Sequence, residues 1–60
     1  MCELKVVVNE KRVFENTIYA KTNGNNVVVK DILGKTMEFE NYSIKEVNLT
    51  KEQLTLSSTK

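Results

Sequence analysis

Residues 2–9 read Cys-Glu-Leu-Lys-Val-Val-Val-Asn, and this stretch decides the fold class. Its apolar positions alternate with mostly polar ones: Cys2, Leu4, Val6 and Val8 against Glu3, Lys5, Val7 and Asn9. A period of two residues places successive side chains on opposite faces of an extended strand. The stretch therefore predicts a β-strand with one apolar face and one mostly polar face.

Turn signals divide the rest of the chain into further short runs. Asn9–Arg12 is polar enough for a hairpin loop, and Asn23-Gly24 is the strongest turn signal because both residues tolerate positive φ. Gly34-Lys35 indicates another turn with Gly34 at positive φ, and Thr50–Gln53 indicates a four-residue hairpin loop. The β-prone runs between the turns are Val13–Ala20, Val27–Ile32, the alternating Met37, Phe39 and Tyr42, then Val47 with Leu49, and last Leu54 with Leu56.

This spacing predicts an all-β domain over residues 1–60, a small antiparallel barrel or sandwich of about six short strands. Closing a barrel would bring the chain ends together, so we expect one shared apolar face. Its members are Leu4, Val6, Val8, Val47, Leu49, Leu54 and Leu56. Two local exceptions are predicted. Ser43, followed by Glu46, resembles a capping box and favours one helical or 3₁₀ turn, and Ser57–Lys60 reads as a frayed tail.

The composition excludes several classes of protein. The chain is 40% hydrophobic and 28% charged, which is typical of a folded domain. No apolar run approaches the roughly 18 residues of a membrane span, and the N-terminus lacks the apolar stretch of a signal peptide. Nine basic residues face eight acidic ones, with no basic block for phosphates. A lone cysteine fits a reducing compartment, so we expect a cytoplasmic protein.

The small size of the chain points to a partner. Sixty residues bury too little surface for a comfortably stable monomer, and such chains usually need disulfides, a metal or another subunit. One cysteine excludes an internal disulfide, and the absence of histidine excludes a His-ligated metal. The sequence therefore predicts a homodimer, a cysteine-based metal site, or both.

No catalytic constellation is present, because histidine, a Gly-rich phosphate loop and a second cysteine are all missing. Glu38 and Glu40 share a strand face, which reads as a solvated surface. We therefore expect no enzyme activity.

Cys2 is the position with chemistry, because its thiolate lies within a few bonds of a backbone amide and the α-amine. If Met1 is removed, the amine and the thiolate of Cys2 can form a five-membered chelate ring. If Met1 is retained, its amine, the Cys2 amide nitrogen and the thiolate can form fused chelate rings. Planar nitrogen and thiolate ligands suit Ni²⁺ or Cu²⁺ better than Zn²⁺. The alternative is that Cys2 is a small buried hydrophobe continuing the apolar face.

Four segments, in this order, resemble the CooT family over nearly the whole chain: Met1-Cys2-Glu3 opening a Val-rich strand, Asp31-Ile32-Leu33-Gly34, Ile44-Lys45-Glu46-Val47-Asn48-Leu49 and Leu54-Thr55-Leu56. The resemblance implies a small β-barrel of SH3 or Sm size, found with carbon monoxide dehydrogenase systems. Members have been treated as nickel-binding homodimers whose cysteine after the initiator Met binds the metal, which maps onto Cys2. Glu3 stands where the best-known opening has methionine.

Two functions follow from the residues and the resemblance together. The first is a nickel-binding accessory protein that holds Ni(II) between two subunits through Cys2, with Met1 and Glu3 supplying further ligands, and passes it to a nickel enzyme. The second is RNA binding, a description that many family members carry. We rank it second because the basic residues are balanced by acids and the four aromatics, Phe14, Tyr19, Phe39 and Tyr42, are expected in the core.

Overall fold

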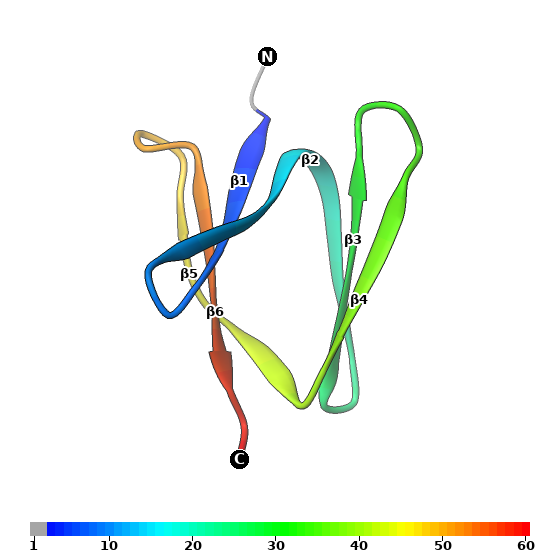
Figure 1. Cartoon of the computed structure of the whole chain (residues 1–60), viewed down its shortest axis with the longest axis vertical. Helices are drawn as coiled ribbons and strands as arrows, with labels where there is room; N and C mark the ends of the chain where they lie inside the picture. The colour runs from blue at the N-terminus through cyan, green and yellow to red at the C-terminus, as the bar shows by residue number, and fades with distance from the viewer. Residues whose placement is uncertain (1–2) are drawn as a thin grey trace.

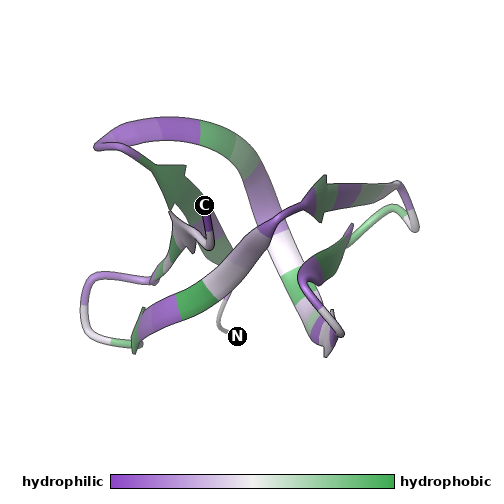
Figure 2. Ribbon diagram, turned by 90° about the horizontal axis from the view of Figure 1, so that it is seen from below, coloured by the Kyte–Doolittle hydropathy of each residue, from purple (hydrophilic) through white to green (hydrophobic). Residues whose placement is uncertain are grey.

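The computed structural model describes residues 3–60, so Met1 and Cys2 lie outside the described residues. Six strands make up the fold: β1 (Leu4–Val8), β2 (Lys11–Asn23), β3 (Asn26–Asp31), β4 (Thr36–Glu40), β5 (Tyr42–Asn48) and β6 (Gln53–Ser58). Within residues 3–60 there is no helix long and apolar enough to cross a membrane. The predicted all-β class is confirmed, and apolar and polar bands alternate along the strands (Figure 2).

The strands form one sheet in the order β4-β3-β2-β1-β6-β5. β4 and β5 lie at opposite ends of this order, yet only Asn41 separates them in the chain. The sheet therefore has to curl until its two edges approach each other, as Figure 1 shows where β4 runs into β5. The Tyr42 amide donates to the Asn25 carbonyl at 2.9 Å across this junction. The result is a barrel-like sheet whose hydrogen-bonded ladder stays open.

One pairing differs from the antiparallel expectation: β1 and β6 are parallel, from Lys5↔Gln53 to Val8↔Leu56. β5 starts at the end of the molecule where β1 finishes, so the β5–β6 hairpin returns β6 in the direction of β1 (Figure 1). Parallel neighbours need a long connection between them. Here the whole of β2 to β5 provides it.

β2 is the longest strand, and a bend divides it into two halves. Its first half pairs with β1, and its second half pairs with β3. Asn16 has φ of 59° at the bend, and its carbonyl accepts from the Ile32 amide at 2.9 Å. Register shifts flank this position on both ladders, and such irregularities increase the local twist. The bend lets one strand serve both halves of the curled sheet.

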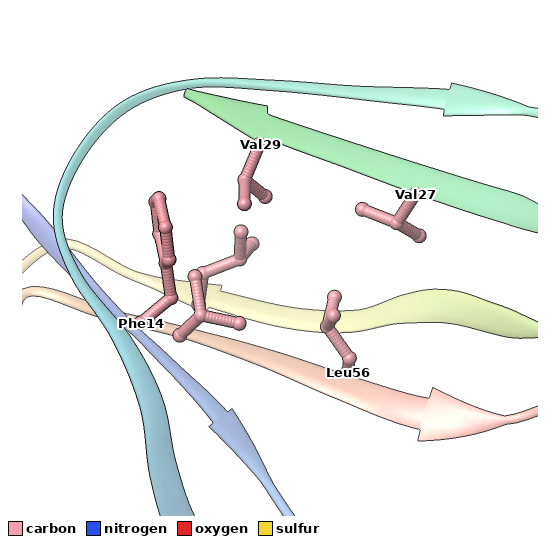
Figure 3. Close-up of a cluster of buried hydrophobic side chains, with 6 residues drawn as sticks. Phe14, Val27, Val29 and Leu56 are labelled. Atoms are coloured by element: carbon pink, nitrogen blue, oxygen red, sulfur yellow. The ribbon is translucent and has the colours of Figure 1, made fainter. Parts of the chain in front are cut away.

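The core lies inside the curl, where four strands contribute its buried side chains (Figure 3). They are Val6, Phe14, Val27, Val29, Leu54 and Leu56. Leu4 and Val8 pack against this cluster while half-buried. The predicted burial of Val47 and Leu49 is wrong, since they are 53% and 61% exposed. β5 is an edge strand with a neighbour on one side only, and Leu49 lies in the turn that follows it.

Backbone conformation at the turns explains the remaining differences. Asn9 and Glu10 both have positive φ and form a two-residue turn, so β2 begins at Lys11 and the predicted Asn9–Arg12 loop is too long. Gly34 has φ of 89°, which confirms the positive φ predicted there. The loop between β5 and β6 covers residues 49–52, one position earlier than predicted.

The predicted helical turn over Ser43–Glu46 is wrong. These residues belong to β5, and Ser43 pairs with Ser57 of β6. Asn41, with φ of 64°, makes the turn alone, so the chain is already extended at Ser43 and ladder pairing replaces the local cap. The tail is shorter than predicted for the same reason, because β6 runs through Ser58.

Thr17 gives a stability prediction. Its side chain is 1% exposed, and its Oγ1 has no hydrogen-bond partner among residues 3–60. A buried hydroxyl without a partner costs about 1–3 kcal/mol. Thr17→Val keeps the shape and removes the hydroxyl, so it should raise the free energy of unfolding by about 1 kcal/mol or more, measured by urea denaturation. Thr22→Val, on the exposed part of the same strand, is the control and should change little. A loss of stability in Thr17→Val would mean that the hydroxyl has a partner.

Candidate functional site: the start of the first strand

Of the three candidate metal ligands, the structure describes Glu3. Met1 and Cys2 lie outside the described residues, while Glu3 is half-buried and directly precedes β1. Covalent geometry places the Cα atoms of consecutive residues about 3.8 Å apart across a trans peptide. The structure therefore defines the start of β1, to which Cys2 is covalently joined through Glu3.

β1 is an interior strand of the sheet and not an edge strand. β1 lies between β2 and β6 in the strand order. Leu4 pairs with Thr17 of β2, and Thr17 pairs in turn with Asp31 of β3. On the other side, the Lys5 amide donates to the Glu52 carbonyl at 2.8 Å. The first residues of β1 are thus fixed by neighbours on both sides, next to the β2 bend and the β5–β6 turn.

The side chains of residues 3–60 do not assemble a metal site by themselves. No group of three or more His, Cys, Asp or Glu is close enough to hold an ion in this part of the chain. Glu38 and Glu40 lie on β4, with β3 and β2 between them and β1, and Glu38 accepts from Asn26 Nδ2 at 3.0 Å. A site built from Glu3 together with these carboxylates is not formed.

A shallow open hollow lies on the outer face of β1, β2, β5 and β6. Its lining mixes three cationic and two anionic side chains with uncharged ones: Lys5, Val7, Glu10, Arg12, Lys45, Glu46, Gln53 and Thr55. Within residues 3–60 the one ion pair is Arg12 with Glu15, at 3.3 Å between half-exposed side chains. Such a pair contributes little to stability. The hollow has no strong charge of one sign that would select a ligand.

All four aromatic residues were predicted to lie in the core, and the structure differs at one of them. Phe14 is buried, and Phe39 and Tyr42 pack edge-to-face with ring centroids 6.1 Å apart beside the core. Tyr19 is 47% exposed, so the prediction is wrong for this residue. It follows the register shift in β2 and pairs with Lys30, whose Nζ lies 5.4 Å from the ring centroid.

Comparison with known proteins identifies the family. The model of the family described as CO dehydrogenase accessory protein CooT matches residues 1–57. The chain belongs to the CooT family. This confirms the resemblance of its four segments, and the matched range includes Met1, Cys2 and Glu3. No curated protein sequence matches the chain. CooT proteins serve CO dehydrogenase as accessory proteins, so the chain has an accessory role and is not itself an enzyme.

Leu33 is 89% exposed in the β3–β4 turn, an exposure that was not predicted. The signal was present in Asp31-Ile32-Leu33-Gly34, because an aspartate two residues before an apolar residue and three before glycine is typical of a hydrogen-bonded turn.

Proposed function

We propose that this protein binds Ni(II) through Cys2 at a homodimer interface and delivers it to CO dehydrogenase in the cytoplasm. The observation that carries the proposal is the family match, which spans the chain from Met1 and includes Cys2. Nickel is the cargo here, and the accessory role of the family supplies the receiving enzyme.

The donor set supports a site shared by two chains. One chain has a single thiol and no histidine, and its acidic residues from 3 to 60 form no cluster. Two Cys2 thiolates across a twofold axis would supply two sulfur ligands. Main-chain nitrogens of residues 1–3 would complete a planar set, with the Met1 amine and the Glu3 carboxylate as further ligands. This is the nitrogen and sulfur environment that Ni²⁺ accepts in square-planar geometry.

Exposed apolar side chains support the homodimer. Among residues 3–60, eight large hydrophobic residues are more than a third exposed: Val13, Ile18, Tyr19, Ile32, Leu33, Met37, Val47 and Leu49. The buried hydrophobic core of the same residues, by contrast, has six members. Single exposed hydrophobics are normal, but so high a proportion in a small chain favours further burial against a partner.

A Ni²⁺ titration at several pH values tests the proposed site. A thiol binds metal as its thiolate, so binding must release a proton and affinity should fall as the pH is lowered. The slope should be about one proton per thiolate, and steeper if amide nitrogens also bind. Affinity that does not change between pH 6 and 8, measured by competition with a chelator of known pH dependence, would contradict thiolate binding.

RNA binding is a second candidate because of Tyr19. Its exposed ring lies on the outer face of β2 and β3, with Lys30 beside it and Lys21 two residues along the same face. Exposed aromatics stack on bases, and lysines contact phosphates. An affinity for single-stranded RNA that falls steeply with salt and is lost in Tyr19→Ala would favour this function over metal delivery.

A further inference from the structure

β4 is an edge strand whose outer side has no hydrogen-bonded neighbour among residues 3–60. It stands at one end of the strand order and pairs only with β3. After Asn41 the chain turns away from β4 into β5 (Figure 1). The pairing of β4 with β3 runs over the whole strand without a register shift. β4 therefore presents a regular, uninterrupted backbone edge, to which another strand can add.

The hydrogen-bond pattern shows which backbone groups of β4 point outward. In an antiparallel ladder, residues that exchange hydrogen bonds with the neighbouring strand alternate with residues that do not. The Asp31 amide donates to the Lys35 carbonyl at 2.8 Å, so the bonded positions along β4 are the odd-numbered ones. The remaining positions direct their N–H and C=O groups away from β3, and they are Thr36, Glu38 and Glu40. An antiparallel partner strand can exchange two hydrogen bonds with each of them.

The opposite edge of the sheet, β5, is less suited to strand addition. Its pairing with β6 is interrupted by a register shift between Ile44 and Glu46. A bulge of this kind twists the strand and breaks the regular spacing of its outward groups. Lys45 lies at the bulge, and a bulge and a lysine both protect natural edge strands from pairing. β4 has neither of them and carries two carboxylates instead.

These carboxylates give one face of the edge a negative charge. Glu38 and Glu40 are exposed, and within residues 3–60 neither takes part in a salt bridge. Glu38 accepts a hydrogen bond from the uncharged Asn26 side chain. Lys30, the cation on the same face of β3, has its Nζ 5.4 Å from the centre of the Tyr19 ring. The two carboxylates are therefore available to cations of a partner strand.

The other face of the β4 edge is apolar. Met37 is 39% exposed, and Phe39 is half-buried and packs against the core. A strand added to β4 places alternate side chains on these two faces, since its side chains have a period of two. Cations at every second position would lie beside the carboxylates, and the apolar residues between them would cover Met37.

We propose that the edge of β4 binds an extended segment of another protein in which Lys or Arg alternates with apolar residues. A second copy of the chain fits less well. Pairing two β4 strands over their full length would place Glu38 directly opposite the partner's Glu38, where like charges are destabilising. This binding edge is separate from the metal site proposed at Cys2, because β3 and β2 lie between β4 and β1.

The test uses a capped heptapeptide, Lys-Val-Lys-Val-Lys-Val-Lys, titrated into isotopically labelled protein and followed by NMR. It should shift the amide signals of Thr36, Glu38 and Glu40 and slow their hydrogen exchange. The same peptide with Glu in place of each Lys should bind about tenfold more weakly or less, because its charge has the wrong sign. A peptide N-methylated at the lysine backbone nitrogens keeps the charge but loses the donors that pair with β4. It should also bind about tenfold more weakly.

Glu38→Lys and Glu46→Lys are the matched protein variants. Both residues are exposed on edge strands, and both substitutions change the net charge by the same amount. Glu38→Lys should weaken binding of the lysine peptide about tenfold, and Glu46→Lys on β5 should change it less than about twofold. Both variants should keep the parent's circular dichroism spectrum.

Three results would overturn the proposal. Equal affinities of the N-methylated and unmodified lysine peptides would show that charge alone accounts for binding. Signal shifts confined to β5, or no saturation up to about 1 mM peptide, would remove the β4 edge as the site. Outward amides of β4 that are protected in the free protein and lose protection on dilution would show that a second copy covers this edge.

Discussion

Cys2→Ser is expected to bind Ni²⁺ at least about 100-fold more weakly than the parent protein, because a hydroxyl is far less acidic and a much weaker ligand than a thiol. The substitution nearly preserves side-chain size, so the fold should be retained. The parent complex should be coloured through sulfur-to-metal charge transfer and diamagnetic if the site is square planar. Absorption spectroscopy during titration with Ni²⁺ measures both the affinity and the colour, and the variant should lose both.

Glu3→Gln is the companion variant for this prediction. Glu3 is the one candidate ligand that the structure describes, half-buried before β1. Its loss should weaken binding much less than the loss of Cys2 while the sulfur charge-transfer band remains. An octahedral site of carboxylates would show the reverse, with a nearly colourless complex that depends on Glu3 and is indifferent to Cys2. Equal Ni²⁺ affinities of the parent and Cys2→Ser would return Cys2 to an ordinary strand position.

Leu54→Ala should have the largest effect on stability. Leu54 is 1% exposed and pairs with Val6 of β1 and Val47 of β5, so it links the parallel and antiparallel ladders of the core. Truncating a buried leucine costs about 2–5 kcal/mol. A chain of this size has a stability of only a few kcal/mol. We expect most of the variant to be unfolded at 37 °C, measured by circular dichroism and urea denaturation.

Leu49→Ala provides the control for the core prediction. Leu49 lies in the β5–β6 turn and is 61% exposed, so its truncation should change the free energy of unfolding by less than about 0.5 kcal/mol. Sequence periodicity had placed both leucines on one buried face. Similar losses of stability in the two variants would show that Leu49 is buried in solution, for example against a second chain.

The two-residue periodicity predicted buried side chains correctly on the interior strands β1 and β6. It failed on the edge strand β5. Val6, Leu54 and Leu56 are buried as their alternation indicates. Val47 pairs with buried Leu54 but is exposed, because it lies on an edge strand. Whether a strand is central or at an edge depends on long-range pairing. Local spacing carries no information about it.

Local turn signals were accurate where one residue type determines the conformation and less so elsewhere. Gly34 has the positive φ expected for it, whereas positive φ at Glu10 and Glu52 could not be read from glutamate. The bend of β2 at Asn16 was also missed, although asparagine is among the residues that tolerate this conformation. That bend matters for the site, because it brings β2 and the β3–β4 turn beside the start of β1.

The candidate site was inferred from the position of one residue and stays a prediction, while the family is confirmed. Cys2 was singled out because it is next to the chain terminus, and the family match includes it. The sequence therefore predicts the chemistry at Cys2, and the fold describes the start of β1 to which Cys2 is joined.

The most direct test of the central claim is native mass spectrometry of the protein with Ni²⁺, in parallel with Cys2→Ser. A shared site predicts a species of two chains with one Ni²⁺, lighter than the sum of its parts by the displaced protons. Cys2→Ser should give no such species under the same conditions. A nickel-bound monomer of the parent protein would contradict the shared site, and a Cys2→Ser dimer that keeps its single Ni²⁺ would contradict the role of the thiolate.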